Sequence, residues 1–293
     1  MSTRVVSHTV RMAAVILALA AVMLLPFLPG GYDGLAQALS VSVQLIGIVG
    51  LLLVPVGVLW LTYEVRKQSR IARRLRHADK RYRFAIAALV VGSSVAVFIA
   101  LAAVAGERRS FGILQLLLWL LVLGRLIRAT RRLKEGEPAS FDATALYLVI
   151  VPVSVLVLQL LLAGSAAEFS RKRAIAASAL MIEEIEAFRA AHGQYPESML
   201  GINKDYQPSV VGIERYHYAR RGAAYNLAFE QPLFLLDDLG AREFVVYNPL
   251  DEHVILSHAV WNIIWAPEVS ATRQGWFATH EAGVPHWRYF RFD

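Results

Sequence analysis

Apolar residues gather in five long blocks within the first 165 residues, and short charged segments separate these blocks. The blocks cover residues 12–28, 41–63, 84–105, 111–126 and 143–163, each boundary being approximate. Each block approaches the roughly 20 apolar residues that an α-helix needs to cross the hydrocarbon core of a bilayer. The pattern therefore predicts a polytopic α-helical membrane protein, with a transmembrane domain of about five helices over residues 1–165.

Two features modify individual spans. Pro55 and Pro152 lie inside the second and fifth expected spans, where a proline frees one helical carbonyl and can bend the helix. Ala36-Gln37-Ala38 has the small-x-small form of a signal-peptidase site. This site directly abuts the second span and lies some distance past the first apolar block, so we expect the first span to be retained.

Orientation follows from the distribution of Lys and Arg. The segment after the second span carries the basic cluster Arg66, Lys67, Arg70, Arg73, Arg74, Arg76, Lys80, Arg81 and Arg83. The loop after the fourth span adds three more cations, whereas Arg108 and Arg109 are the only cations of the opposite loops. Because cytoplasmic loops are enriched in Lys and Arg, the N-terminus is expected in the cytoplasm and residues 166–293 outside it. Arg171, Lys172 and Arg173 follow the fifth span and argue the other way.

The net charge of +7 is divided unevenly between the two parts of the chain. Residues 1–169 contain 18 Lys and Arg against 8 Asp and Glu, which gives +10; residues 170–293 contain 12 against 15, which gives −3. The basicity therefore marks the membrane part and does not indicate a nucleic-acid partner for the C-terminal domain. Cysteine is absent, which excludes disulfides and thiolate metal sites. Arg outnumbers Lys and Ala is abundant, which favours a GC-rich bacterial genome. The membrane is therefore expected to be a bacterial cytoplasmic (inner) membrane.

Residues 166–293 read as an α+β domain, with a long helix followed by an antiparallel β-meander. The helix is expected over Ser170–Ala191, nearly continuous with the fifth span and with any break at Gly164-Ser165. Alternating aromatic residues predict a hairpin of strands 213–220 and 223–230. A second pair, 243–247 and 254–257, is expected around the turn Asn248–Glu252.

The C-terminal tail is expected to complete the sheet. It carries the aromatic residues Trp276, Phe277, Trp287, Tyr289 and Phe290.

A short motif ends the expected helix of this domain. Gly193 supplies a left-handed cap, Tyr195 can pack back on the helix, and Pro196 prevents its continuation. With the preceding apolar stripe and the following meander, this segment resembles the pseudopilins of type II secretion, over about residues 143–257. The resemblance implies a shared domain shape. The chain lacks the prepilin cleavage pattern and the Asp-rich calcium loop of that family, so a secretion role does not follow from it.

Candidate chemistry is sparse. Asp251, Glu252, His253 and His258 are of the right types to bind a metal ion, but their spacing matches no established ligand pattern, so no metal and no cofactor is assigned. No catalytic motif is recognised, and the expected spans carry no deep Asp, Glu, Lys or His of the kind that marks ion pathways. The basic cluster is expected to fix topology, with anionic lipid headgroups as its alternative partner.

Three classes of function remain open. We favour a non-enzymatic envelope protein, whose spans anchor an extracytoplasmic domain that binds an envelope protein partner. The first alternative is a transport or channel component with an outer cap domain. The second is a membrane-anchored envelope enzyme, for which Asp251, His253 and His258 are the candidate residues.

Overall fold

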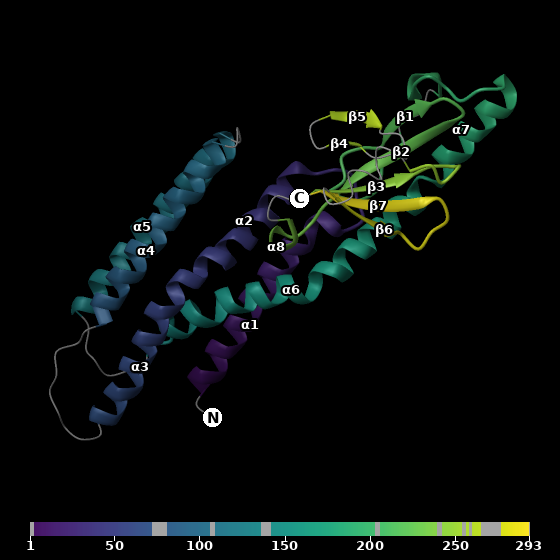
Figure 1. Cartoon of the computed structure of the whole chain (residues 1–293). Helices are drawn as coiled ribbons and strands as arrows, with labels where there is room; N and C mark the ends of the chain where they lie inside the picture. Colours follow the sequence, from purple (N-terminus) through teal and green to yellow (C-terminus); the bar gives the residue numbers. More distant parts are fainter. Residues whose placement is uncertain are drawn as a thin grey trace. The chain divides into compact units, whose positions relative to one another are not determined.

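The computed structural model describes residues 3–71, 81–105, 109–135, 142–202, 206–238, 242–253, 256–257, 260–264 and 277–292. The first part of the chain is helical, and an antiparallel sheet follows near the C-terminus (Figure 1). The residues group into two compact units. We call them the helical unit, Met1–Ala21 with Ser42–Leu158, and the sheet unit, Val22–Val41 with Gln159–Asp293.

The helices before the sheet follow the apolar blocks of the sequence. They are α1 (Thr3–Leu24), η1 (Leu25–Phe27), α2 (Gly34–Gly50), η2 (Leu51–Leu53), α3 (Val54–Ile71), α4 (Arg81–Ala105), α5 (Arg109–Glu135), α6 (Thr144–Ala177) and α7 (Ala179–His192). Within the described residues, four stretches are long and apolar enough to cross a membrane: Ser7–Phe27, Gly34–Arg66, Arg81–Leu101 and Thr144–His192. The expected span 111–126 lies in α5 and is helical, but it is not among these four.

The two prolines act differently. Pro55 is the second residue of α3, directly after the 3₁₀ turn η2, and at that position its missing N–H is least costly. Pro152 lies inside α6, which continues through it and through Gly164-Ser165 as far as Ala177. The expected break at Gly164-Ser165 is therefore wrong. The interruption falls at Ser178, whose buried hydroxyl donates to the Ile175 carbonyl at 2.7 Å.

Small residues let the helices of the helical unit approach closely. A Cβ atom on Gly57 would lie 2.7 Å from Val149 Cγ2, and one on Gly50 would lie 3.0 Å from the Pro152 ring. Gly50 ends α2 and Gly57 lies in α3, and the two contacts run in opposite order along α6, so the α2–α3 segment and α6 are antiparallel. The helices α4 and α5 form a second antiparallel pair (Figure 1), in which Gly92 faces the Trp119 ring.

The described residues of the sheet unit form a five-stranded antiparallel sheet with the strand order β1-β2-β3-β7-β6. The strands are β1 (His217–Arg221), β2 (Ala224–Gln231), β3 (Arg242–Tyr247), β6 (Phe277–Glu281) and β7 (Trp287–Phe292). A separate two-stranded sheet consists of β4 (Leu256–Ser257) and β5 (Val260–Ile264), and short helical turns η3 (Met199–Ile202) and α8 (Leu235–Asp238) precede β1 and β3.

The expected first hairpin is confirmed as β1 and β2, joined through Gly222 at φ +54°. The expected pairing of 243–247 with 254–257 is wrong, because β3 pairs with β2 and β7. This arrangement places Val245 in the core with Phe229 and Trp287, which the short β4 could not do. The tail completes the sheet through β6 and β7, as expected; Trp276 lies outside the described residues.

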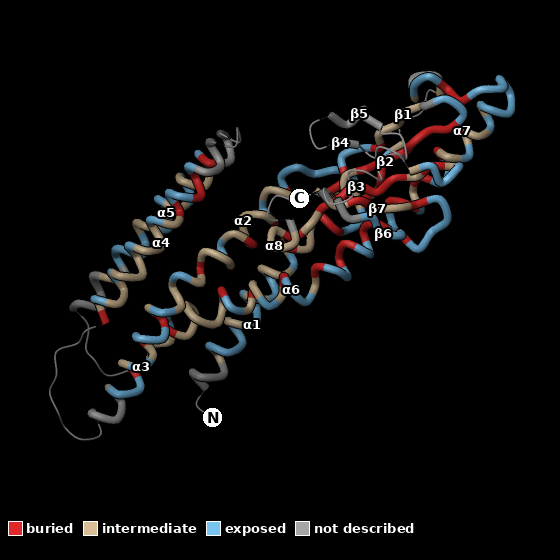
Figure 2. The backbone as a smooth tube through the Cα atoms, in the orientation of Figure 1, coloured by how far each residue is buried: buried red, intermediate tan, exposed pale blue. Residues whose placement is uncertain are grey.

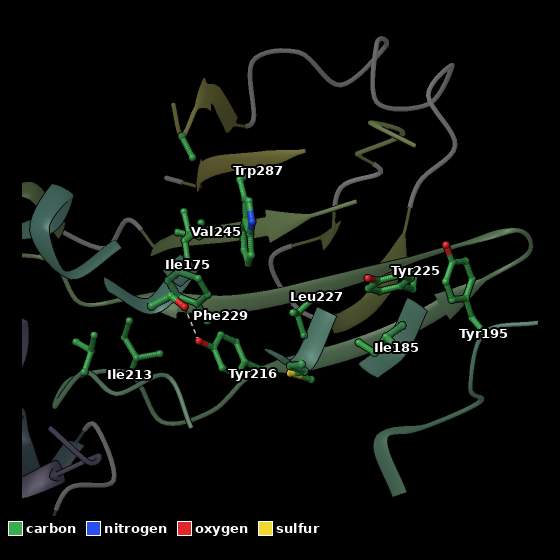
Figure 3. Close-up of a cluster of buried hydrophobic side chains, with 14 residues drawn as sticks. Ile175, Ile185, Tyr195, Ile213, Tyr216, Tyr225, Leu227, Phe229, Val245 and Trp287 are labelled. Atoms are coloured by element: carbon green, nitrogen blue, oxygen red, sulfur yellow. Dashed lines mark hydrogen bonds between the residues drawn. The ribbon is translucent and has the colours of Figure 1, made fainter. Parts of the chain in front are cut away.

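Buried positions concentrate in β2 and β3, while the helices show mixed exposure (Figure 2). The main core lies between the sheet and the helices α6 and α7 (Figure 3). Met181 and Ile185 supply the expected helical stripe, and Tyr225, Leu227 and Phe229 supply the facing side of β2. The Tyr216 hydroxyl donates to the Ala174 carbonyl at 2.5 Å and joins the start of the meander to α6.

Candidate functional site

The metal-ligand candidates lie in the turn that follows β3. Both ring nitrogens of His253 face carbonyl oxygens, that of Asp251 at 3.2 Å and that of His286 at 3.0 Å. The Asp251 carboxylate pairs instead with His286 Nδ1 at 3.1 Å. His258 lies outside the described residues, and within them no group of three His, Asp or Glu side chains could hold a metal ion. The turn thus brings Asp251 and His253 together with His286, which sequence reasoning did not single out.

Asn248 organises this turn. Its side-chain Nδ2 donates to Asn226 Oδ1 on β2 at 2.8 Å, and its backbone N–H donates to the His286 carbonyl at 3.0 Å. Asp251 and His286 both have positive φ, +57° and +64°, which non-glycine residues rarely adopt. The hydrogen bonds and the Asp251–His286 pair hold these two strained positions against each other.

The protonation state of His253 affects this arrangement. Burial lowers the pKa of His253, although its backbone hydrogen bonds act in the opposite direction. A neutral imidazole has one N–H and can donate to only one of the two carbonyl oxygens, whereas the protonated ring can donate to both. The number of hydrogen bonds that His253 can donate therefore depends on its protonation state. The hydrogen bond to the His286 carbonyl connects the turn after β3 to the residue before β7.

The Gly-x-Tyr-Pro segment has the geometry expected of it. Gly193 is left-handed at φ +73°, and its N–H donates to the Arg189 carbonyl at 2.8 Å. Tyr195 is 2% exposed, packs on Tyr225, and its hydroxyl accepts from Arg189 Nη1 at 2.6 Å. Burial, followed by the nearby charge of Glu186, raises the pKa of Tyr195. These contacts give the segment a structural role.

Pro196 completes this segment. It is buried, and its carbonyl accepts a hydrogen bond from the Tyr218 hydroxyl at 2.7 Å. The chain that leaves α7 is thereby attached to the edge strand β1.

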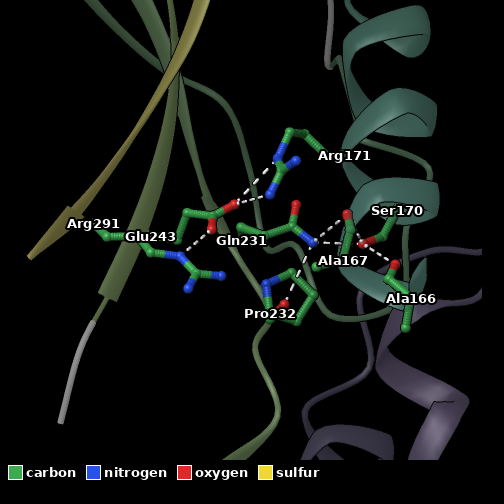
Figure 4. Close-up of polar contacts among 8 residues, drawn as sticks. All are labelled: Ala166, Ala167, Ser170, Arg171, Gln231, Pro232, Glu243 and Arg291. Atoms are coloured by element: carbon green, nitrogen blue, oxygen red, sulfur yellow. Dashed lines mark hydrogen bonds and ion pairs between the residues drawn. The ribbon is translucent and has the colours of Figure 1, made fainter. Parts of the chain in front are cut away.

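A buried polar cluster joins α6 to the sheet (Figure 4). Glu243 on β3 is fully buried and accepts hydrogen bonds from Arg171 on α6 and, at 2.9 Å, from Arg291 on β7. The Arg171 guanidinium also lies 3.8 Å from the centre of the Tyr289 ring. Burial acts to lower the pKa of Arg291, but the hydrogen bond to Glu243 and the nearby negative charges of Glu243 and Asp237 together raise it. One carboxylate thus ties three elements together.

A second contact lies beside this cluster. Gln231, the last residue of β2, donates through Nε2 to the Ser170 hydroxyl at 2.5 Å and to the Ala167 carbonyl at 3.2 Å. Lys172, the neighbour of Arg171, pairs with Glu168 one helical turn earlier at 2.5 Å. Two of the three cations that follow the fifth expected span are therefore paired with carboxylates of the sheet unit.

The segment between α1 and α2 is part of the sheet unit. Leu28, Gly30 and Asp33 exchange backbone hydrogen bonds of 3.0–3.1 Å with residues 209–211, and Pro29 forms a β-bridge with Val210. The Gly212 N–H donates to the Pro26 carbonyl at 2.7 Å. Phe27 is 2% exposed and packs on Phe234 with ring centres 4.8 Å apart. Sequence reasoning missed this contact; glycines at positions 30 and 212 were its one visible signal.

A buried ion pair joins three helices of the helical unit. Glu64 on α3 is fully buried and accepts from Arg81 of α4 through Nε at 2.6 Å and Nη2 at 2.8 Å. Trp60 Nε1 donates to the same carboxylate at 3.3 Å, and the backbone N–H of Asp142, just before α6, approaches it at 3.4 Å. The sequence shows Glu64 as an isolated acid at the start of the basic cluster, but it does not indicate which cation is its partner.

The structure separates the members of that basic cluster. Arg81 is buried against Glu64, whereas Arg66 and Arg83 are exposed. The backbones of Lys67 and Arg70 belong to α3, and Arg73, Arg74, Arg76 and Lys80 lie outside the described residues. Nine apparently equivalent cations therefore include at least one with a structural role.

No protein-family model matches the chain, and comparison with curated proteins and with solved structures gives no match either. The assignment of function therefore depends on the geometry above. Within the described residues, the polar clusters fasten secondary-structure elements to one another.

Proposed function

We propose that this chain is a multi-pass protein of a bacterial inner membrane, with five spans, a cytoplasmic N-terminus and a non-enzymatic extracytoplasmic domain that binds an envelope partner. The observation that carries the topology is the Glu64 cluster. It brings together Glu64 near the end of α3, Arg81 at the start of α4 and Asp142 just before α6. The chain that leaves along α4 must therefore return to the same side before α6 begins, and the antiparallel helix α5 supplies this return.

The remaining helix ends support the same count. In the helical unit, the Tyr147 hydroxyl near the start of α6 donates to the His8 carbonyl near the start of α1 at 3.3 Å. In the sheet unit, the segment between α1 and α2 docks on residues 209–212. Both contacts agree with alternation along five spans. The basic cluster then favours the Glu64 side as the cytoplasmic one. Arg171, Lys172 and Arg173 precede a long domain, and long domains translocate largely regardless of their charge.

The interaction role is supported by the composition of the sheet unit. It includes the C-terminal end of α1, the first part of α2 and the last part of α6 in addition to its strands. The helix, Gly-x-Tyr-Pro turn and meander also support a pseudopilin-like domain shape. Glu64 does not favour transport, because its charge is matched by Arg81 in a bidentate pair.

Reporter fusions test the topology. A periplasm-active phosphatase should be active when it is fused after Asp293 and inactive when it is fused at His77. A cytoplasm-active reporter should give the opposite pattern at both positions. The reverse result at either site would contradict the proposed orientation.

Photocrosslinking in intact cells tests the binding role. A photoreactive amino acid at the exposed positions Glu214 or Val284 of the sheet unit should capture a reproducible envelope protein, and the same probe at the buried Leu227 should capture none. Absence of any specific product at both exposed positions would count against the binding role and leave the topology unaffected.

A further inference from the structure

The exposed cations beside the Glu64–Arg81 pair differ from that pair in surroundings and in charge balance. Glu64 and Arg81 have side chains 1% and 7% exposed, and they neutralise each other. Arg66 and Arg83 each lie two residues further along their helices. Because successive helical residues are rotated by about 100°, two residues turn a side chain roughly to the opposite face. Arg66 and Arg83 are accordingly exposed, and within the described residues neither has an acidic partner.

Aromatic side chains lie at the same level along these helices. The Phe84 ring on α4 lies 6.2 Å from Trp60 and 5.6 Å from Tyr63 of α3, measured between ring centres. Tyr82 contacts Arg83, whose guanidinium lies 6.0 Å from the ring centre. Trp and Tyr are enriched where membrane helices cross the headgroup layer, because their rings are apolar and their N–H and O–H groups are polar.

We propose that Arg66 and Arg83, which face outward from two different helices, each bind the phosphodiester of an anionic phospholipid, while Arg81 is withheld from lipid by Glu64. This inference rests on the proposed membrane spans and adds a partner to them. A phosphodiester supplies the anionic oxygens to which a guanidinium group donates. The Glu64–Arg81 pair keeps α3 and α4 together, so that both exposed arginines stay at headgroup depth.

Charge alone would make all three arginines equivalent lipid ligands. The structure instead predicts that removing Arg66 and Arg83 weakens lipid binding and leaves the fold intact, whereas removing Arg81 weakens the fold. An arginine near an anionic membrane surface contributes about 1 kcal/mol, so the loss of either arginine should weaken lipid binding at its helix by roughly fivefold. The effect should diminish as salt increases, because these side chains are exposed.

The test uses the full chain in a neutral detergent, titrated with phosphatidylglycerol and followed by native mass spectrometry. We expect tighter binding of phosphatidylglycerol than of phosphatidylcholine with the same acyl chains. The variant Arg66→Gln/Arg83→Gln should lose most of this preference. The matched control Arg173→Gln/Arg215→Gln removes two exposed arginines of the sheet unit and should retain it. Inorganic phosphate should compete weakly, since it lacks the acyl chains.

Equal binding of the two lipids by the wild-type chain would overturn the proposal. Equal losses in the test and control variants would also overturn it, because binding would then reflect net charge alone. Thermal unfolding of each variant separates lost binding from lost folding. The reporter fusions remain an independent measurement: a reversed topology with a retained lipid preference would refute the proposed orientation and keep the lipid site.

Discussion

Two fully buried carboxylates, one in each unit, hold helices in place by different means. In the helical unit, Glu64 meets a single arginine, and the pair is neutral. In the sheet unit, Glu243 meets Arg171 and Arg291, and the group carries an excess positive charge. The excess is tolerated because Arg291 is 36% exposed and reaches water, while Arg171 stacks on Tyr289.

Under the proposed topology, the difference follows from what surrounds each group. The Glu64 pair lies among helices that end at the membrane surface, where an unmatched buried charge is costly and must be neutralised by its partner. A domain in water can leave one side of a buried cluster open to solvent. The two clusters perform the same task, joining a helix to its neighbours, and under this topology they do so in two different surroundings.

Removing the carboxylate of Glu64 should have the largest effect. The variant Glu64→Gln leaves Arg81 buried and charged, and breaking a buried pair in this way costs about 3–5 kcal/mol. Thermal or detergent-induced unfolding of the full chain measures the loss. The double variant Glu64→Gln/Arg81→Gln restores neutrality and should be more stable than either single variant. Additive losses would show that the two side chains act independently.

The corresponding change in the sheet unit should cost less. In Glu243→Gln, Arg291 can turn to water and Arg171 keeps its aromatic contact, so we expect a loss of about 1.5–3 kcal/mol. Glu281→Gln is the control, because Glu281 is exposed and lies 3.7 Å from Arg288, and it should change the unfolding free energy by less than about 1 kcal/mol. A loss as large as that of Glu64→Gln would contradict the proposed role of solvent.

The docked segment between α1 and α2 offers a smaller test within the sheet unit. A Cβ atom at Gly212 would lie 2.7 Å from the Pro26 carbonyl oxygen, so Gly212→Ala should destabilise the contact by about 1–3 kcal/mol. Hydrogen exchange at the Gly30 and Asp33 amides should become faster. Gly164→Ala, which meets nothing within 4 Å, should leave their exchange unchanged. Unchanged exchange in both variants would place the docking contact in doubt.

The smallest expected effect concerns pH. Burial lowers the pKa of His253, so the unfolded chain binds a proton at a higher pH than the folded chain does. The free energy of unfolding should therefore decrease as the pH falls below about 6.5, the ordinary imidazole value. In His253→Gln this decrease should be smaller. The remainder is expected from His217, whose pKa is also lowered, first by burial and then by Arg215. The exposed His280→Gln should retain the full decrease.

Local patterns predicted the parts of the fold that depend on neighbouring residues. Apolar length identified the helices, and the Gly193–Pro196 signals correctly ended α7, because a cap needs only a few adjacent residues. The hairpin of β1 and β2 was predicted for the same reason. The partner of β3 was not, because β7 is distant in the sequence and pairs through burial of Val245 rather than through a turn.

Side-chain clusters were harder to predict than secondary structure. Glu64 and Arg81 lie at the ends of two expected spans, where charges ordinarily mark topology, and nothing in their spacing reveals that they pair. Glu243 was assigned to a strand, but its two arginine partners come from α6 and β7. Of the candidate metal ligands, His258 lies outside the described residues, and Asp251 pairs with His286, which follows more than 30 residues later.

The docking of the α1–α2 segment also sets an order of events during biosynthesis. Leu28 emerges from the ribosome about 180 residues before its partner Val211. At a translation rate of about 5–20 residues per second, the residues that complete its hydrogen bonds are synthesised roughly 10–40 s after this segment. A chain arrested before residue 209 would therefore leave Phe27 without its contact to Phe234. Under the proposed topology, premature termination in this interval should yield a product that is inserted in the membrane but is a preferred target for quality-control proteases.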